Sequence, residues 1–243
     1  MRLCLLIVAA AIAGCASVLS ETGSSTPSVA VPVSLPLTFT ARDKAGWENV
    51  SLPGKLRTAF RVEKHQGRPS VRADAERSAS MLRQKLHIEP EQLNRLSFEW
   101  QVESLIAQAD MRHRDTEDSP VRLILAFDGD RQKFSARNAM LSELSRALTG
   151  DEMPYATLMY VWSNQQPVES IIINPRTDRV RKIVVETGPA HLKQWLRYDR
   201  QISADFEKAF GEPPGALLGL AIMTDTDNTQ SHARAWYGEI RLD

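Results

Sequence analysis

Residues 225–229 are the part of this chain whose types and spacing most directly suggest chemistry. They read Asp-Thr-Asp-Asn-Thr and follow an apolar run. Calcium binds several carboxylate and carbonyl oxygens within one short loop, and Asp225, Asp227 and Asn228 can supply three. An EF-hand is excluded, because Gln230 stands where such a loop needs glycine. Two interpretations remain open: a structural calcium site completed by ligands from elsewhere, or side chains that bond their own turn.

The last apolar run carries the candidate ligand-binding residues. Trp236 shares its parity with His232 and Arg234, which places all three on the polar face of a strand. An exposed indole ring beside cationic side chains is typical of a binding patch. We therefore predict that Trp236, Arg234 and His232 contact a ligand such as a sugar.

Catalytic motifs are scarce. Glu99 and Glu103 share one polar strand face, and paired carboxylates act in glycosidases, although a solvated strand face explains them more simply. The sequence contains no nucleophile elbow, P-loop, HExxH or dinucleotide-binding glycine motif. The equal counts of 30 Lys+Arg and 30 Asp+Glu lack the basic excess of nucleic-acid-binding proteins. No catalytic residue is assigned, and we expect no nucleic-acid partner.

The elements that position these side chains are β-strands, because period-two alternation dominates beyond Leu37. Residues 96–103 alternate strictly, which predicts that Trp100 is buried and the odd positions face water. Residues 121–127 are apolar on both faces and predict a central strand, followed by a hairpin turn at 128–130. Further strands are predicted at 156–162, 168–173, 180–185, 217–223 and 233–242. Short strands separated by turns predict a mainly β fold, an antiparallel jelly-roll-like β-sandwich.

Two segments interrupt the strand pattern. Residues 136–148 place apolar side chains on one stripe at helical spacing, between Ser135 as N-cap and Gly150 as C-terminal signal. Residues 202–210 predict a shorter helix. We expect both helices to be insertions that cover a sheet edge or an open end.

The final strand changes parity at Gly238. Tyr237 lies on one apolar face, whereas Ile240 and Leu242 fall on the opposite parity. Either a β-bulge at the glycine resets the face that points inward, or one strand ends there and another begins.

The N-terminus reads as a targeting segment. Residues 1–14 combine a basic start, a short apolar run and small residues, and Cys15 follows them. The sequence before Cys15 resembles the lipobox of bacterial lipoproteins, which implies a signal peptide over 1–14 and a lipid on Cys15. Ala16 follows the cysteine, which by the same resemblance favours the outer membrane, facing the periplasm. The lipidated residue and a Ser/Thr/Pro-rich tether span 15–36, and one domain spans 37–243.

Several stretches together resemble one family. They are Trp47 with Ser51 to Lys55, Thr58 to Phe60, Ser78 to Leu82, Phe98 to Trp100, Phe127 to Asp130, Leu158 to Ser163, Asp205 to Glu212, Asp225 to Thr229, and Ala235 to Ile240. This pattern is similar to domain-of-unknown-function family 3047, bacterial envelope proteins without an agreed activity, so no functional residue is carried over. The ending Gly238 to Leu242 also resembles jelly-roll, galactose-binding-like modules, which implies a sandwich able to bind sugar.

The sequence thus favours a lipid-anchored envelope protein whose β-sandwich binds a glycan or another envelope component without catalysis. One alternative is an envelope polysaccharide hydrolase or lyase that uses Asp or Glu residues, with Asp225 and Asp227 as candidates. A second alternative is a structural subunit of an envelope complex.

Overall fold

The computed structural model describes residues 35–40 and 46–243. The predicted signal peptide over 1–14 and the lipid on Cys15 lie outside the described residues. Of the predicted tether, only its last two residues, 35 and 36, are described. None of the helices within the described residues has the length and apolarity that a bilayer-spanning helix needs.

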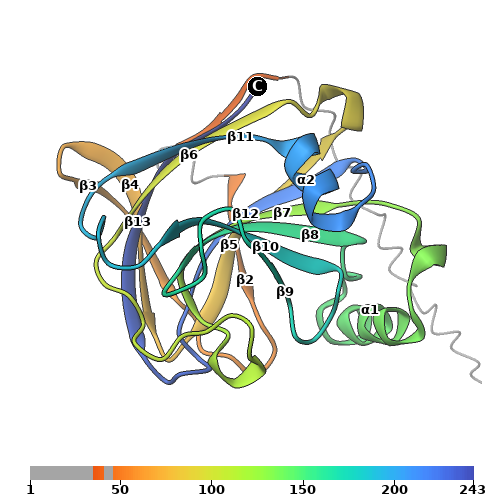
Figure 1. The fold of residues 1–243 in the computed structure, drawn as a ribbon, viewed down its shortest axis with the longest axis horizontal. Coiled ribbons are helices and arrows are strands. Elements are labelled where there is room, and N and C mark those ends of the chain that lie inside the picture. The colour runs from red at the N-terminus through yellow and green to blue at the C-terminus, as the bar shows by residue number, and fades with distance from the viewer. Residues whose placement is uncertain (1–34, 41–45) are drawn as a thin grey trace, which may run out of the picture.

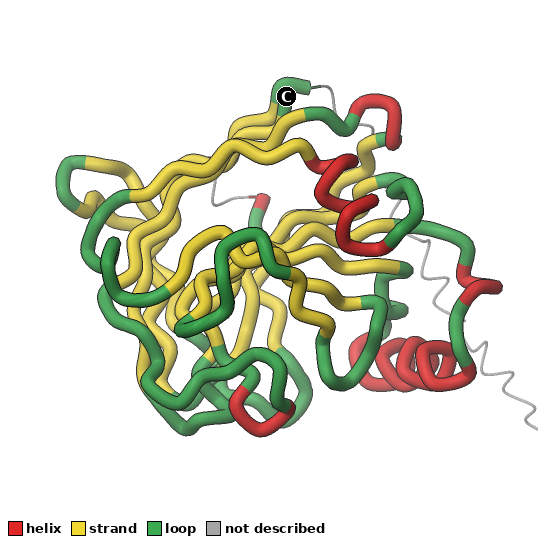
Figure 2. Tube along the Cα trace, viewed as in Figure 1, coloured by secondary structure: helices red, strands yellow, loops and turns green. Residues whose placement is uncertain are grey.

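Two β-sheets pack face to face (Figures 1 and 2). The six-stranded sheet has the order β11 (Leu196–Gln201), β6 (Arg95–Val102), β13 (His232–Leu242), β4 (Arg68–Glu76), β3 (Ala59–His65), and β1 (Leu37–Phe39) also pairs with β13. The seven-stranded sheet has the order β2 (Glu48–Ser51), β5 (Ala79–Ile88), β12 (Leu217–Asp225), β7 (Ser119–Phe127), β8 (Ala156–Ser163), β10 (Val180–Thr187), β9 (Ile171–Ile173). Apart from the parallel pair β8 and β10, neighbouring strands are antiparallel. The predicted β-sandwich is confirmed.

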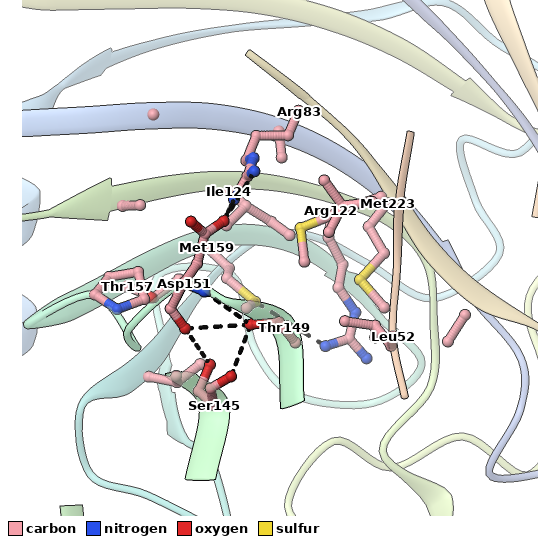
Figure 3. Close-up of a pocket in the computed structure, with 18 of the residues that line it drawn as sticks. Leu52, Arg83, Arg122, Ile124, Ser145, Thr149, Asp151, Thr157, Met159 and Met223 are labelled. Atoms are coloured by element: carbon pink, nitrogen blue, oxygen red, sulfur yellow. Dashed lines mark hydrogen bonds and ion pairs between the residues drawn. The ribbon is translucent and has the colours of Figure 1, made fainter. Parts of the chain in front are cut away.

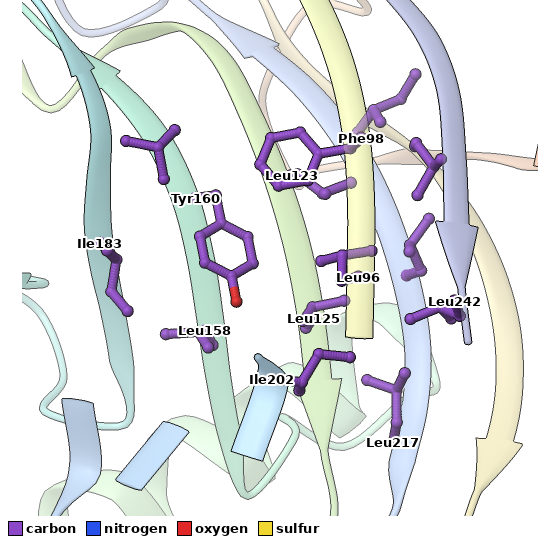
Figure 4. Packing of buried hydrophobic residues seen from close by; sticks show 14 of the residues in the cluster. Leu96, Phe98, Leu123, Leu125, Leu158, Tyr160, Ile183, Ile202, Leu217 and Leu242 are labelled. Atoms are coloured by element: carbon purple, nitrogen blue, oxygen red, sulfur yellow. The ribbon is translucent and has the colours of Figure 1, made fainter. Parts of the chain in front are cut away.

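The core fills the space between the sheets (Figure 4). Leu96 and Phe98 of β6 point towards Leu123 and Leu125 of β7, and Trp100 is fully buried as predicted. Burying one such large apolar side chain contributes about 1.5–3 kcal/mol. The strand alternation seen in the sequence therefore corresponds to a real inner face.

The other face of residues 96–103 is only partly in water: Glu99 and Glu103 are half-buried, and the prediction is wrong for two other odd positions. Ser97 and Gln101 are both buried. The segment before β11 lies on this face, where the Gln101 amide donates to the Lys193 carbonyl at 2.8 Å, while Arg197 of β11 donates to Ser97 at 3.1 Å. A polar residue at an alternating position can thus be covered by a loop that local sequence does not reveal.

Strand β13 continues through Gly238, which confirms the β-bulge interpretation. Its register against β6 shifts between Tyr237 and Ile240. A Cβ atom on Gly238 would lie 2.4 Å from the Glu99 Oε1 atom, so the bulge brings the backbone against that side chain. The bulge lets Tyr237, Ile240 and Leu242 all reach the core.

The hairpin turn predicted at 128–130 is wrong. Strands β7 and β8 do pair antiparallel, but the connection between them contains helix α1 (Ala136–Thr149). Helix α2 (Ile202–Phe210) lies at one open end of the sandwich, with Ile202 and Phe206 buried in the core. Short 3₁₀ helices occupy Pro90–Gln92, Arg114–Thr116 and Arg131–Lys133.

Helix α1 has its predicted ends but not the orientation that its stripe suggested. Ser135 caps the first turn by accepting from the Asn138 amide at 3.2 Å, and Gly150 ends the helix with φ of 80°. The helix lies on the outer side of the seven-stranded sheet, yet its apolar stripe, including Leu144, faces solvent.

Candidate ligand-binding groove

A groove of about 1160 Å³ lies on the outer face of the seven-stranded sheet, opposite the core. We call it the outer groove. Because side chains alternate along each strand, the residues between the core positions of β5, β12, β7 and β8 form its floor. The floor comprises Met81, Met223, Ala221, Ile124, Ala126, Thr157 and Met159. Helix α1 closes one side through Ser145 and Leu148, and the loop at 52–55 closes another.

The floor is apolar and unusually adaptable. Three of its side chains, Met81, Met159 and Met223, are methionines, which adjust their shape more readily than branched or aromatic side chains. Within residues 35–40 and 46–243, no tryptophan, tyrosine or phenylalanine lines the outer groove. The floor therefore offers flexible apolar contacts rather than stacking on aromatic rings.

An ion pair joins β5 to the segment after α1 at the rim. Arg83 donates to Asp151 at 3.2 Å and to Glu48 of β2 at 2.9 Å. Figure 3 shows Arg83 and Asp151 meeting above Ile124 and Met159. Partly exposed ion pairs of this kind contribute about 0–1 kcal/mol, so an entering ligand can displace this one at small cost.

The end of the groove near Asp225 is a buried ionic cluster organised by Glu117. Its carboxylate lies 3.3 Å from Arg122, 2.9 Å from Lys182 and 2.7 Å from Arg176, and accepts from Asn174 at 2.8 Å. Burial alone would raise the pKa of Glu117, but Arg122, Lys182 and Arg176 outweigh it and lower this pKa. Burial also lowers the pKa of Lys182 to about 8, although Glu117 opposes the change. Glu117 is therefore the anion that holds the buried cations together.

The pKa of Asp225 shifts in the opposite direction to that of Glu117. Burial raises the pKa of Asp225 well above the ordinary value, and Asp118 and Asp227 raise it further, against the influence of Arg122 at 2.9 Å. One oxygen of Asp225, Oδ1, is buried with no hydrogen-bond partner. The groove thus places Asp225, whose charged form burial disfavours, beside Asp227, which pairs with Lys55.

A family model described as "Protein of unknown function (DUF3047)" matches residues 45–241 of the chain. The chain belongs to this family. No curated protein matches it in sequence. The resemblance identified from the sequence is therefore confirmed, and membership of DUF3047 by itself assigns no activity.

Solved structures similar to this DUF3047 protein include carbohydrate-binding modules. The family 11 module of cellulosomal cellulase Lic26A-Cel5E from Clostridium thermocellum shares 8% identity at a TM-score of 0.42, covering 86% of this chain and 95% of the module. The xylan-binding module CBM86 from Roseburia intestinalis shares 11% identity at a TM-score of 0.33, and the match covers 86% of this chain and 96% of the module. The xyloglucanase domain of NopAA from Sinorhizobium fredii, solved with cellobiose, shares 10% identity at a TM-score of 0.43, and the match covers 86% of this chain and 97% of that domain. With TM-scores this low, no ligand or activity is transferred from these structures.

Of the three predicted calcium ligands, the structure of this DUF3047 protein brings Asp225 and Asp227 together, but the third nearby ligand group is a different residue, Asp118. One carboxylate oxygen from each of Asp118, Asp225 and Asp227 lies within 4.8 Å of the other two. Asn228, the predicted third ligand, uses its side-chain amide to donate to the Arg114 carbonyl. Asp118 is far from this loop in sequence, and for that reason local sequence did not indicate it.

Cationic side chains and hydrogen-bond donors of the protein already contact the three carboxylates of Asp118, Asp225 and Asp227. Lys55 pairs with Asp227, Arg122 pairs with Asp225, and Asp118 accepts from the Thr229 amide at 2.7 Å and its hydroxyl at 2.6 Å. A calcium ion would have to displace Lys55 from Asp227 and Arg122 from Asp225, and burial already disfavours the charged form of Asp225. The donor set therefore does not favour calcium.

We expect that EDTA leaves the melting temperature of the DUF3047 protein unchanged, and that added calcium does not raise it. The reason is that Lys55 and Arg122 already neutralise the Asp225 and Asp227 region. Differential scanning calorimetry checks this, with magnesium as the control cation. A melting temperature that EDTA lowers and calcium restores would establish a structural calcium site instead.

The predicted exposure of Trp236 is wrong. The imidazole of His65 stacks on the indole at 3.8 Å between ring centres, and the indole nitrogen donates to Glu63 at 2.9 Å, so only 6% of the residue is exposed. Arg234 pairs with Asp74, and His232 is exposed at the start of β13. The binding role of Trp236, Arg234 and His232 stays a prediction, but no sugar can stack on this indole while His65 covers it.

The two groups of predicted residues do not form one site. Asp225 and Asp227 line the outer groove of the seven-stranded sheet, whereas Trp236 and Arg234 belong to β13 of the six-stranded sheet. Sequence reasoning missed Glu117 and Arg122, which lie in the groove. The signal that could have found Arg122 is a charge inside the apolar run 121–127, since a buried arginine requires a buried anion.

Proposed function

We propose that this protein is a glycan-binding domain and that the outer groove is its ligand site. The single observation that carries the proposal is an open groove of about 1160 Å³ whose floor is apolar and whose ends are polar. A sugar chain presents C–H faces to apolar surfaces and hydroxyl groups to polar ones. Pockets that combine an apolar lining with a few convergent polar groups are the default binding sites of proteins.

The polar groups of the groove suit hydroxyl ligands. Lys55 and Arg176 remain partly exposed at one end, with 38% and 41% of their side chains accessible. At the other end the Arg83 and Asp151 pair supplies donors and acceptors that a ligand can share. Both signs of charge occur along the rim, so it offers donors as well as acceptors to the hydroxyl groups of a glycan.

Binding of the full-length protein to lipopolysaccharide, peptidoglycan sacculi and a glycan array tests this proposal. We expect saturable binding to at least one of these probes. If none binds, the proposed function is wrong, and co-purification after mild crosslinking would then test a structural subunit role.

We also propose that the protein is anchored by a lipid on Cys15, at the outer membrane and facing the periplasm. The support is the sequence of residues 1–36, with its short apolar run, small residues and Ser/Thr/Pro-rich tether. An acyl anchor suits a chain without a net basic charge, because acyl chains bind bilayers without electrostatic help.

The substitution Cys15→Ser is expected to release the protein from the membrane fraction and to abolish labelling by an alkyne fatty acid. The reason is that no other residue of the chain would carry the lipid. Fractionation and gel fluorescence measure both effects, with Cys4→Ser as the matched control that leaves them unchanged. Equal labelling of both variants would contradict the anchor at Cys15.

Hydrolysis of the bound glycan is the second candidate function, and the pairing of Asp225 with Asp227 favours it. Burial raises the pKa of Asp225 well above its ordinary value, and one of its carboxylate oxygens lies within 4.8 Å of one of Asp227. Retaining glycosidases likewise use a proton donor of raised pKa and a second carboxylate about 5–5.5 Å away. Asp225 would protonate the departing glycosidic oxygen while Asp227 attacks the anomeric carbon, which breaks the glycosidic bond and forms a glycosyl ester on Asp227. Asp225 would then take a proton from water as the water oxygen attacks the anomeric carbon, which breaks the ester, releases the sugar and leaves Asp225 protonated again.

Under this alternative, Asp225→Asn should abolish the release of reducing ends while binding persists. Asparagine keeps the shape of the neutral acid but has no proton to transfer. A reducing-sugar assay on the polysaccharide that binds measures the effect, with Asp130→Asn at an exposed turn as control. Wild-type protein that binds the polysaccharide and releases no reducing ends would rule out hydrolysis.

A further inference from the structure

The end of the outer groove near Asp225 exposes its cations and buries its acids. Lys55 lines this end with 38% of its side chain exposed, whereas its partner Asp227 has only 9% exposed. Arg176 is 41% exposed, whereas its partner Glu117 is 5% exposed. We call this part of the groove the cationic end. A ligand that enters here meets the two exposed cations before it meets the more buried carboxylates.

The opposite end of the groove does not share this arrangement. There, Glu48 and Asp151 are more exposed than Arg83, the cation that both of them contact. Exposed carboxylates repel an anionic group and exposed cations attract it. A negatively charged part of a ligand therefore fits the cationic end rather than the opposite one.

Two buried polar atoms at the cationic end have no hydrogen-bond partner among the residues that the structure describes. They are Arg122 Nε and Asp225 Oδ1, which belong to groove-lining side chains that are only 3% and 8% exposed. Arg122 Nε is a donor and requires an acceptor, such as a carboxylate oxygen. Asp225 Oδ1 suits a hydroxyl group, which can donate to it or accept from it in either protonation state. Because buried polar atoms without partners are unfavourable, a ligand that supplies both groups is stabilised here.

The charges at this end favour a singly charged anion. Among the described residues, four cations and four acids form one set of contacts: Lys55, Arg122, Arg176 and Lys182 with Glu117, Asp118, Asp225 and Asp227. Burial raises the pKa of Asp225, and any proton that it retains leaves positive charge without an internal partner. A carboxylate compensates such an excess, whereas a phosphate monoester, with a charge of about −1.5 to −2, is repelled more strongly by the acids.

We propose that the cationic end binds the carboxylate of a uronic acid, so that the ligand of the outer groove is an acidic polysaccharide. This inference rests on the proposed glycan-binding function and names the class of sugar. A guanidinium group pairs with a carboxylate through two parallel N–H donors, and within the described residues the Arg176 side chain uses only Nη1, for Glu117. A uronic acid carries hydroxyl groups on the same ring as its carboxylate, which matches the donor of Arg122 and the oxygen of Asp225.

Calorimetric titration of the full-length protein with oligogalacturonate, and with the same oligosaccharide after methyl esterification of its carboxylates, tests the inference. Oligoglucuronate and oligomannuronate, each with its methyl ester, extend the test to other uronic acids. We expect at least one free acid to bind at least about tenfold more tightly than its ester. Added NaCl should reduce this preference, because salt screens exposed charges.

The substitution Arg176→Gln should remove most of the preference for the free acid and leave the affinity for the ester unchanged. Glu117 keeps Arg122 and Lys182 as partners in this variant, so the fold is expected to survive, which an unchanged melting temperature checks.

Lys55→Gln is a second variant with the same expected effect, because it removes the other exposed cation of this end. Arg241→Gln is the matched control. Arg241 is 44% exposed and pairs with an acid, Asp243, but it belongs to β13 of the other sheet. It should leave the affinities for both the acid and the ester unchanged.

Equal affinity for each uronate and its ester, in a protein that binds a neutral glycan, would overturn the inference but not the proposed function. Binding of no glycan at all would overturn both. Tighter binding of a phosphomannan with phosphate monoesters than of every uronate would also overturn the inference, because the site would then select phosphate. The same holds if Arg176→Gln and Lys55→Gln both keep the preference, or if Arg241→Gln reduces it equally.

Discussion

Replacing Glu117 with alanine is expected to lower the free energy of unfolding by about 3–5 kcal/mol. The substitution leaves Arg122 and Lys182 buried without their shared anion, since these residues are only 3% and 0% exposed. Asp225 is a poor replacement for this anion, because burial raises its pKa well above the ordinary value and so disfavours its charged form. Urea unfolding followed by circular dichroism measures the loss.

Glu169→Ala is the matched control for this prediction. Glu169 also contacts two cations, Arg200 at 2.5 Å and Lys208 at 2.7 Å, but 46% of its side chain is exposed. Water solvates those cations when the carboxylate is removed, so we expect a loss below about 1 kcal/mol. If Glu117→Ala and Glu169→Ala destabilise the protein equally, Glu117 does not organise the cluster.

The contributions of Glu117 and Asp225 to the free energy of unfolding should change with pH in opposite directions. The folded pKa of Glu117 is lowered, so its stabilising contribution is present above the unfolded pKa and is lost as pH falls through the folded value. The folded pKa of Asp225 is raised, so the folded state binds the extra proton and stability decreases as pH rises above the unfolded value. Asp225→Asn should remove only this second dependence.

Filling the outer groove is expected to weaken glycan binding at least about tenfold. Ala126 is suited to this purpose, because it points outward from β7 into the groove between core residues Leu125 and Phe127. A tryptophan in its place would occupy the space above the floor without entering the core. Titration of lipopolysaccharide or of whichever glycan binds the wild type measures the change.

Val62→Trp serves as the control for the filled groove. It adds the same ring to an exposed strand position on the other sheet, so any effect of surface tryptophan alone appears in both variants. Both proteins should keep wild-type melting temperatures. If Ala126→Trp binds the ligand as tightly as the wild type and Val62→Trp do, the ligand lies outside the outer groove. The surroundings of Trp236 would then be the next candidate site.

Much of the fold follows from local patterns in the sequence. Alternation around Trp100 identified a strand with a buried face, and the parity change at Gly238 identified a bulge that the register of β13 confirms. The ends of α1 followed from Ser135 and Gly150, because capping depends on neighbouring backbone groups. These features need only information within a few residues.

The site could not be predicted in the same way. Glu117 and Arg122 are five residues apart, but Lys182 and Asp225 come from distant parts of the chain, and sheet pairing brings them to this pair. Trp236 has the parity of an exposed residue, yet His65 from another strand covers it. The orientation of α1 depends on the contacts of Asn138 with Asp178 and Thr177, which are 40 and 39 residues away in the sequence. Long-range contacts of this kind leave no local signal.

Methyl NMR of methionine-labelled protein tests the central claim most directly, because Met81, Met159 and Met223 report from the floor of the outer groove. Spectra would be recorded while lipopolysaccharide, or another glycan that binds, is added to saturation. The account predicts that these three methyl signals shift or broaden in proportion to occupancy. Saturable binding that leaves all three signals unchanged would contradict the assignment of the outer groove as the ligand site.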